Sequence, residues 1–227
     1  MRKILSLILL FAVTSVYAGN NDIYITQSGT GLTMNIDQIG DTNKVGTSQT
    51  RATFTGTSMT VDIDQVGDSN TMAASVAQGN STSFTASTTG DSNTTTLALG
   101  ASGDVANTDF DYAATGDSNT VTFTQGAAAT ATAGNQDIVI AGNSNDLNAT
   151  CEVVGCINNW DIDGDENDID TTQTGNSDHS ITAEIDGSTN NIDIDQTNST
   201  GSVSDVVVIT STTSNATIDI DQCTSGC

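Results

Sequence analysis

The chain has 227 residues, no proline, 4% aromatic residues and a formal net charge of −24 at pH 7. Its 28 acidic residues far outnumber its four basic ones, so it would repel nucleic-acid phosphates, and we expect no nucleic-acid partner. A chain this rich in small polar residues would be disordered if it lacked periodicity, but a clear periodicity is present. The absence of proline fits long, uninterrupted ladders of backbone hydrogen bonds.

The first 18 residues have the features of a secretory signal peptide. Arg2 and Lys3 form a charged start, residues 4–13 form an apolar run, and Val16-Tyr17-Ala18 provides a cleavage site. The apolar run is too short for a transmembrane helix. We therefore predict a signal peptide over residues 1–18 and an exported mature chain whose single repeat domain spans residues 19–227.

Two neighbouring segments, residues 29–43 and 56–70, repeat one another at most positions. Within each copy, apolar and polar residues alternate with a period of two, which is the spacing of a β-strand with one buried face. Each copy ends in Gly-x-x-Asn, whose glycine and asparagine suit a tight turn. One repeat is therefore predicted to be a strand followed by a turn.

Counting in twos from each turn predicts which side chains face inward. Residues two, four and six before the turn glycine share one face, as do those two, four and six after the turn asparagine. For the turn at Gly116, the rule selects Phe110, Tyr112, Ala114, Val121, Phe123 and Gln125. Both strands flanking the turn then close over one core.

Turn glycines recur along the whole chain, at Gly40, Gly67, Gly90, Gly116, Gly142, Gly164, Gly175 and Gly187. Most gaps between them correspond to one coil, and the two short gaps that Gly175 creates correspond to half coils. A chain that retraces one strand-arc-strand path stacks each coil on the previous one. We predict an all-β fold, a β-solenoid of stacked strand-arc-strand repeats with about eight or nine coils. Less regular stretches at 49–55, 127–133 and 200–214 are expected to be bulges or loops.

The pattern Gln-x-Gly-x-x-Asn-x-(small apolar)-x-x-x-Gln resembles the curlin repeat of curli subunits, which form a bacterial functional amyloid. The strict motif is present at Gln38, Gly40, Asn43, Val45 and Gln49. A second copy has Gln65, Gly67 and Asn70, with its last glutamine displaced to Gln78, and partial copies contain Gln27, Gln173, Gln196 and Gln222.

This resemblance implies a secreted subunit of a pilus-like, curli-type fibre on the cell surface, either a major subunit or a nucleator. Its partners would be further copies of itself, a nucleator or other curlin-like subunit, and an outer-membrane secretion pore. Such fibres support the biofilm matrix, surface adhesion and cell aggregation.

Physical reasoning also favours a fibre. A solenoid ends in two open strand edges, and repetition makes each end complementary to the other. Repeated amides one rung apart are expected to form ladders. The positions expected to stack are Gln27, Gln38, Gly40, Asn43, Gln49, Gln65, Gly67, Asn70, Gln78, Gly90, Asn93, Gly116, Asn119, Gly142, Asn145, Gln173, Gln196 and Gln222. The alternative is a monomeric secreted solenoid with capped ends, serving as an adhesin or a calcium-binding module.

Outward aspartates are expected to repel one another across rungs, so that acid or divalent cations would promote assembly. One acidic stretch also resembles an EF-hand or dockerin calcium loop, with candidate ligands Asn159, Asp161, Asp163, Asp165, Asn167 and Asp170. The alternative for that stretch is an ordinary strand-turn-strand unit. No other cofactor is expected.

Four cysteines suit an oxidising compartment and are expected to form two disulfides. Three pairings are possible; we favour the local one, Cys151 with Cys156 and Cys223 with Cys227.

Two further functional classes were considered. Thr-x-Thr runs at 53–55, 122–124 and 130–132 are similar to the threonine arrays of ice-binding solenoids, although they do not fall at equivalent coil positions. An enzyme is not expected, because serine lacks a nucleophile-elbow context and no phosphate-binding glycine loop is present. The single histidine, His179, is expected to be exposed beside the Gly175 turn.

Overall fold

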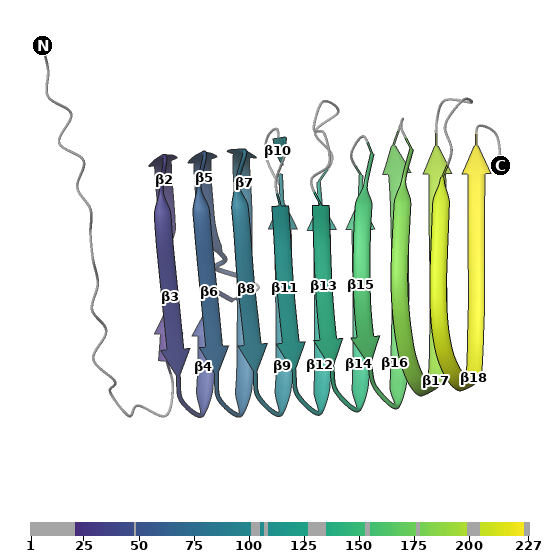
Figure 1. Cartoon of the computed structure of the whole chain (residues 1–227). Helices are drawn as coiled ribbons and strands as arrows, with labels where there is room; N and C mark the ends of the chain where they lie inside the picture. The colour runs from purple at the N-terminus through teal and green to yellow at the C-terminus, as the bar shows by residue number, and fades with distance from the viewer. Residues whose placement is uncertain are drawn as a thin grey trace, which may run out of the picture.

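The protein is a β-solenoid. The computed structural model describes residues 21–47, 49–100, 105–106, 109–126, 135–152, 155–175, 178–198 and 205–224, so the predicted signal peptide lies outside the described residues. These residues form parallel strands and no helix, wound into about seven turns that follow one another along a single axis (Figure 1). None of the described segments is therefore a helix able to cross a membrane. The predicted fold class is confirmed, with slightly fewer turns than the eight or nine expected.

The rod has two long faces. The first face stacks β3 (Thr33–Ile39), β6 (Thr60–Val66), β8 (Ser83–Thr89), β11 (Asp109–Thr115), β13 (Asn135–Ala141), β15 (Ile157–Asp163) and the first halves of β17 (Ser180–Asn198) and β18 (Val206–Thr224). Every pair is parallel and in register, so each residue lies beside its equivalent in the next coil. The fold thereby converts sequence repeats into columns of side chains.

The second face runs in the opposite direction. It contains β1 (Asn21–Ile23), β2 (Thr26–Thr30), β4 (Thr42–Val45), β5 (Ala52–Thr57), β7 (Ser69–Asn80), β9 (Ser92–Leu99), β10 (Val105–Ala106), β12 (Ser118–Gln125), β14 (Ser144–Cys151), β16 (Glu166–Gly175) and the second halves of β17 and β18. Its strands are also parallel to one another. Strand β18 forms the outer edge of both faces at the C-terminal end (Figure 1).

Glycine is required at the corner where the first face passes into the second. A Cβ atom placed on Gly67 would lie 1.5 Å from the carbonyl oxygen of Gly40 in the previous coil, and one on Gly116 would lie 1.9 Å from that of Gly90. The column continues through Gly142, Gly164 and Gly187. Gly175 is not part of it: it ends β16 at the opposite corner of the rod, as the half-coil spacing implies.

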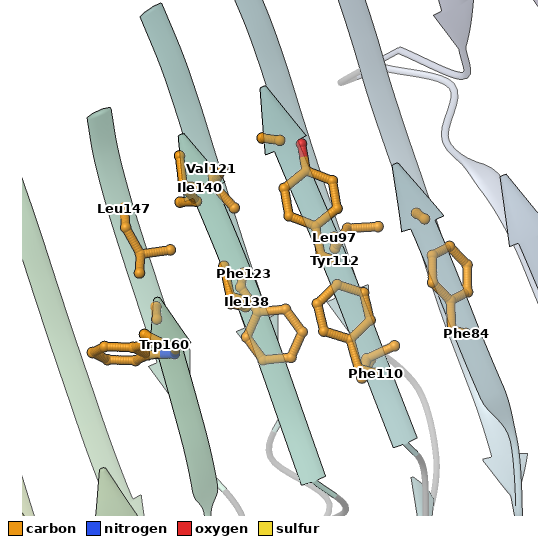
Figure 2. Packing of buried hydrophobic residues seen from close by; sticks show 14 of the residues in the cluster. Phe84, Leu97, Phe110, Tyr112, Val121, Phe123, Ile138, Ile140, Leu147 and Trp160 are labelled. Carbon is orange, nitrogen blue, oxygen red and sulfur yellow. The ribbon is translucent and has the colours of Figure 1, made fainter. Parts of the chain in front are cut away.

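The core is a continuous apolar column between the two faces. Counting in twos correctly predicted its lining, since Phe110, Tyr112, Val121 and Phe123 are all buried. Phe84 and Phe110, from neighbouring coils of the first face, have ring centroids 5.8 Å apart, and Phe110 packs across the core against Phe123 of the second face, with ring centroids 4.9 Å apart (Figure 2). Burial is therefore shared along the whole axis.

The stretches expected to be irregular have three different outcomes. Residues 52–57 form β5, with a register shift between Phe54 and Thr55 that agrees with the expected bulge, whereas residues 206–214 belong to β18, where the prediction of bulges or loops was wrong. Residues 127–133 lie outside the described residues. Residues 49–50 do form a bend, which explains the exposure of Gln49 described below.

Candidate assembly surfaces: amide ladders and open ends

A ladder of buried asparagines runs along the inside of the glycine corner. The Nδ2 atom of each asparagine donates to Oδ1 of the next, at 3.0 Å from Asn43 to Asn70, 2.9 Å from Asn70 to Asn93 and 2.8 Å from Asn93 to Asn119. Further bonds, of 2.8 to 2.9 Å, extend the ladder through Asn145, Asn167 and Asn190. Every bond points the same way along the rod.

The ladder asparagines from Asn43 to Asn167 also hold the turn of the following coil. The Nδ2 of Asn43 donates to the carbonyl oxygen of Val66 at 2.6 Å, and that of Asn70 donates to Thr89 at 2.7 Å. These carbonyls precede the turn glycine of their own coil and also accept a backbone hydrogen bond from the turn glycine of the previous coil, at 2.9 Å from Gly40 to Val66 and 2.8 Å from Gly67 to Thr89. The asparagines therefore stabilise both the turn and the stacking of coils.

Sequence reasoning missed three members of this ladder: Asn21, Asn167 and Asn190. Asn167 and Asn190 each lie three residues after a turn glycine, so the Gly-x-x-Asn spacing would have identified them. Asn21 is aligned with Asn43 and donates to it at 3.2 Å. At the other end the ladder stops, because the residue aligned with Asn190 is Ala216.

The inward glutamines form two separate, shorter ladders. On the first face, Gln65 donates to Gln38 at 2.7 Å, and the next position in that column is Thr88. On the second face, Gln196 donates to Gln173 at 2.7 Å and Gln222 donates to Gln196 at 2.6 Å.

Gln49 does not stack. Val45 and Ala52 pair with Met72 and Ala74, which are only two residues apart, so the segment between Val45 and Ala52 contains extra residues that bulge outward. Gln49 lies in this bulge and is exposed, which overturns its predicted inward position. Gln27 is half-buried in the first rung, and the side chain of Gln78 lies outside the described residues.

The two ends of the rod leave their inward-facing side chains uncovered. Ile192 and Ile194 are buried on β17, whereas their partners on β18, Ile218 and Ile220, are 46% and 41% exposed. At the N-terminal end, apolar side chains that include Ile23, Ile25 and Met34 are only partly buried. Within the described residues, neither end has a cap.

Outward aspartates gather in columns towards the C-terminal end of the second face. Asp170, Asp193 and Asp219 are aligned across three rungs, and Asp195 and Asp221 are aligned across two. Rungs about 4.8 Å apart place these charges close enough for each like pair to cost on the order of 1 kcal/mol before screening by salt.

Burial, together with neighbouring carboxylates, raises the pKa values of several outward aspartates on both faces. Partial burial raises the pKa of Asp62, and the carboxylates of Asp64 and Asp37 add to the effect. Burial also raises the pKa values of Asp111 and Asp146, reinforced by aspartates of neighbouring rungs.

The proposed calcium ligands do not converge. Asn159, Asp161 and Asp163 lie on β15 in the first face, whereas Asp170 lies outward on β16 in the second face, with the core between them. Asp165 is at the corner, and Asn167 is buried in the asparagine ladder. No group of three or more His, Cys, Asp or Glu side chains able to hold a metal was found among the described residues. The stretch is an ordinary strand-turn-strand unit.

His179 is buried, so the prediction of an exposed histidine was wrong. Its Nδ1 accepts a hydrogen bond from the backbone N–H of Cys156 at 3.2 Å. The backbone N–H of His179 donates to the Asp205 carboxylate at 3.0 Å. Burial lowers the pKa of His179, and the nearby Asp205 and Asp178 partly offset this effect. Counting back in twos from Gly187 reaches His179 and would have predicted its inward position.

The three cysteines of the described residues are disulfide-bonded. Cys151 and Cys156 form a disulfide, which is the local pairing favoured above. Cys223 is also disulfide-bonded, and Cys227 lies outside the described residues.

The threonine runs do not make a continuous array. Thr53 and Thr124 belong to one column, but Ser75 and Ala98 separate them, and residues 130–132 lie outside the described residues. A smaller set does align on the second face, where Thr94 and Thr96 stack on Thr120 and Thr122.

Comparison with protein-family models, curated proteins and solved structures finds no match to this chain. The fold therefore defines the class of protein: a β-solenoid, an architecture consistent with a solenoid adhesin or a fibre-like protein.

Proposed function

We propose that the protein is a structural subunit of an extracellular, curli-type fibre that supports a biofilm matrix, surface adhesion and cell aggregation. It would be secreted and would act through self-association, without catalytic activity. Export through an outer-membrane pore, and assembly with a nucleator or another curlin-like subunit, belong to the same proposal.

The observation that carries the proposal is the open C-terminal end. Strand β18 pairs with β17 on one side only, and its inward-facing Ile218 and Ile220 are exposed. An unpaired edge strand is a template for another strand, and an exposed apolar edge favours such pairing. The internal steps of the rod already use parallel pairing, in register except at the bulges of β4–β5, so adding a coil from another copy repeats an existing geometry.

The amide ladders support the same function. Stacked asparagines and glutamines are characteristic of cross-β fibres, where identical side chains hydrogen-bond along the fibre axis. Here the asparagine ladder follows the rod axis within one molecule. A monomer with these ladders already has the internal order of a short fibre.

Electron microscopy of the purified mature chain at micromolar concentration, with amyloid-dye fluorescence alongside, tests the proposal. We expect unbranched fibres whose growth accelerates when preformed fibres are added as seeds. A chain that stays monomeric by light scattering over a wide range of concentrations would overturn the proposal and favour a monomeric solenoid adhesin.

A further inference from the structure

The first and last strands of the second face have the same inward pattern. At the C-terminal end, Ile218 and Gln222 face inward, four residues apart. At the N-terminal end, Ile23 and Gln27 are also four residues apart, and exposure alternates regularly from Asn21 to Gln27. Both segments therefore present an isoleucine, a second isoleucine and a glutamine to the core side.

The strand register places these residues in the same columns. Ile23 pairs with Val45, and that column continues rung by rung to Ile192 and Ile218. Gln27 pairs with Phe54, and its column continues to Gln196 and Gln222. A further strand that pairs with β18 in the same register would thus have the inward-facing residues that segment 21–27 provides.

The first face has one rung fewer than the second, because β1 and β2 form a rung of the second face before β3 begins the first (Figure 1), so the same register leaves the first face open at the junction. There the columns of Met34 and Ile36 on β3 end at Val207 and Ile209 on β18. All four side chains are inward-facing, and only Ile36 is fully buried. These apolar side chains would border a gap one strand wide on the first face, and the second face would make the direct contact between copies.

Charge distinguishes this junction from the internal steps. Inside the rod, Asp219 and Asp221 each stack on another aspartate of β17. At the proposed junction, they would instead face Tyr24 and Thr26, which adjoin Ile23 and Gln27. The junction thus adds no like-charged pair at these positions, whereas joining two C-terminal ends would bring the aspartates of both copies together.

We propose that the occupant of the C-terminal end is the N-terminal coil of a second copy, with residues 21–27 stacked on 216–222 across the second face. This inference rests on the proposed fibre function and adds the partner strands, their register and the head-to-tail direction. The glutamine ladder from Gln173 to Gln222 would continue into Gln27 of the next copy.

Charge substitution at the junction tests this register. The double variant Tyr24→Asp/Thr26→Asp, made in the mature chain, would place two carboxylates opposite Asp219 and Asp221. We expect seeded elongation to slow by roughly 10-fold at low ionic strength, with less effect at high salt. Adding Asp219→Lys and Asp221→Lys to the same chain should restore elongation.

A matched control carries Asp193→Lys and Asp195→Lys with the two N-terminal changes. These lysines belong to the same columns but lie one rung further from the junction, so they should restore elongation much less. Circular dichroism and thermal unfolding of the monomers would verify that all variants keep the fold, as expected for exposed positions.

The two proposals fail in different ways. If the wild-type chain forms no fibres, the fibre function itself is wrong. If it forms fibres but the N-terminal aspartates leave elongation unchanged, or the two lysine pairs rescue equally, the fibre survives and the register is wrong.

Discussion

Asn119 donates a hydrogen bond from Nδ2 to Oδ1 of Asn145 at 2.8 Å, and both side chains are almost completely buried. The same Nδ2 contacts the carbonyl oxygens of Ala141 and Gly116 at 3.2 Å. One side chain thus links its own corner to the next coil through both side chain and backbone.

Replacing Asn119 with alanine should destabilise the rod by about 3 kcal/mol. The change removes two ladder bonds and the bond that Asn119 donates to the carbonyl oxygen of Ala141 in the next coil. Urea unfolding of the monomer, followed by circular dichroism, measures the loss. Asn143→Ala is the matched control, because Asn143 is exposed at the neighbouring corner. Equal stabilities of the two variants would show that the ladder contributes little.

Gly116→Ala should be more damaging, with a loss of about 3 kcal/mol or more and a reduced yield of folded protein. A Cβ atom there would lie 1.9 Å from the carbonyl oxygen of Gly90, so the two coils would have to separate. Gly29→Ala provides the control, since no atom lies within 4 Å of a Cβ at that position. Thermal unfolding of both variants gives the comparison. If the Gly116→Ala protein unfolds at the same temperature as the wild type, the close stacking of the corners is contradicted.

The outward aspartates should make the rod more stable in mild acid. The pKa values of Asp62, Asp111 and Asp146 are raised in the folded state, so the native protein retains protons that the unfolded chain has lost. Their contribution is complete below the unfolded value of 3.8 and is lost as pH rises through the raised values. We expect the free energy of unfolding to increase as pH falls from 6 towards 4 at low salt.

Fibre elongation should follow the same trend, and sodium chloride at pH 7 should reproduce part of it through screening. Urea titrations and seeded dye-binding assays at each pH measure the two effects. Replacing Asp62, Asp111 and Asp146 with asparagine should flatten the pH dependence of stability. A dependence that is unchanged in this triple variant would assign the effect to other groups.

His179 should act in the opposite direction. Its folded-state pKa is lowered, so the unfolded chain binds a proton more readily, and stability falls as pH drops below the unfolded value of about 6.5. Protonation of Nδ1 would also break the hydrogen bond from the N–H of Cys156.

The protein has one histidine, so its imidazole resonance can be titrated directly by NMR. We expect a pKa below 6.5 in the folded monomer and a normal value in the urea-unfolded chain. The variant His179→Gln should lose the fall in stability near pH 6 while keeping the rise near pH 4. A folded-state pKa at or above 6.5 would mean that Asp178 and Asp205 outweigh burial.

The fold was predictable because its main determinant is local. Alternation with a period of two, interrupted at regular intervals by Gly-x-x-Asn, identified inward residues such as Phe110, Tyr112 and Phe123. In a solenoid, each coil contacts mainly its neighbours, so a rule that is valid for one repeat extends along the chain. The same rule, extended by one step beyond Ile181, also gives the inward position of His179, which lies eight residues before Gly187.

Other features depend on the alignment between coils, which one repeat cannot reveal. Gln49 matches the curlin-like motif but bulges outward, because the segment between Val45 and Ala52 is longer than its counterpart in the next coil. The calcium-loop spacing at 159–170 is correct in sequence, yet it spans a corner and separates the ligands onto two faces. Motif spacing alone did not reveal that separation.

The asparagine ladder ends because residue 216 is alanine, and this affects how a filament of these rods would break. Seven side-chain bonds join the asparagines from Asn21 to Asn190, whereas the last rung contributes none. Under shear, such a filament would snap at the seams between molecules before any single molecule tore. Each fragment would contain a whole number of molecules, and each break would create one new N-terminal end and one new C-terminal end.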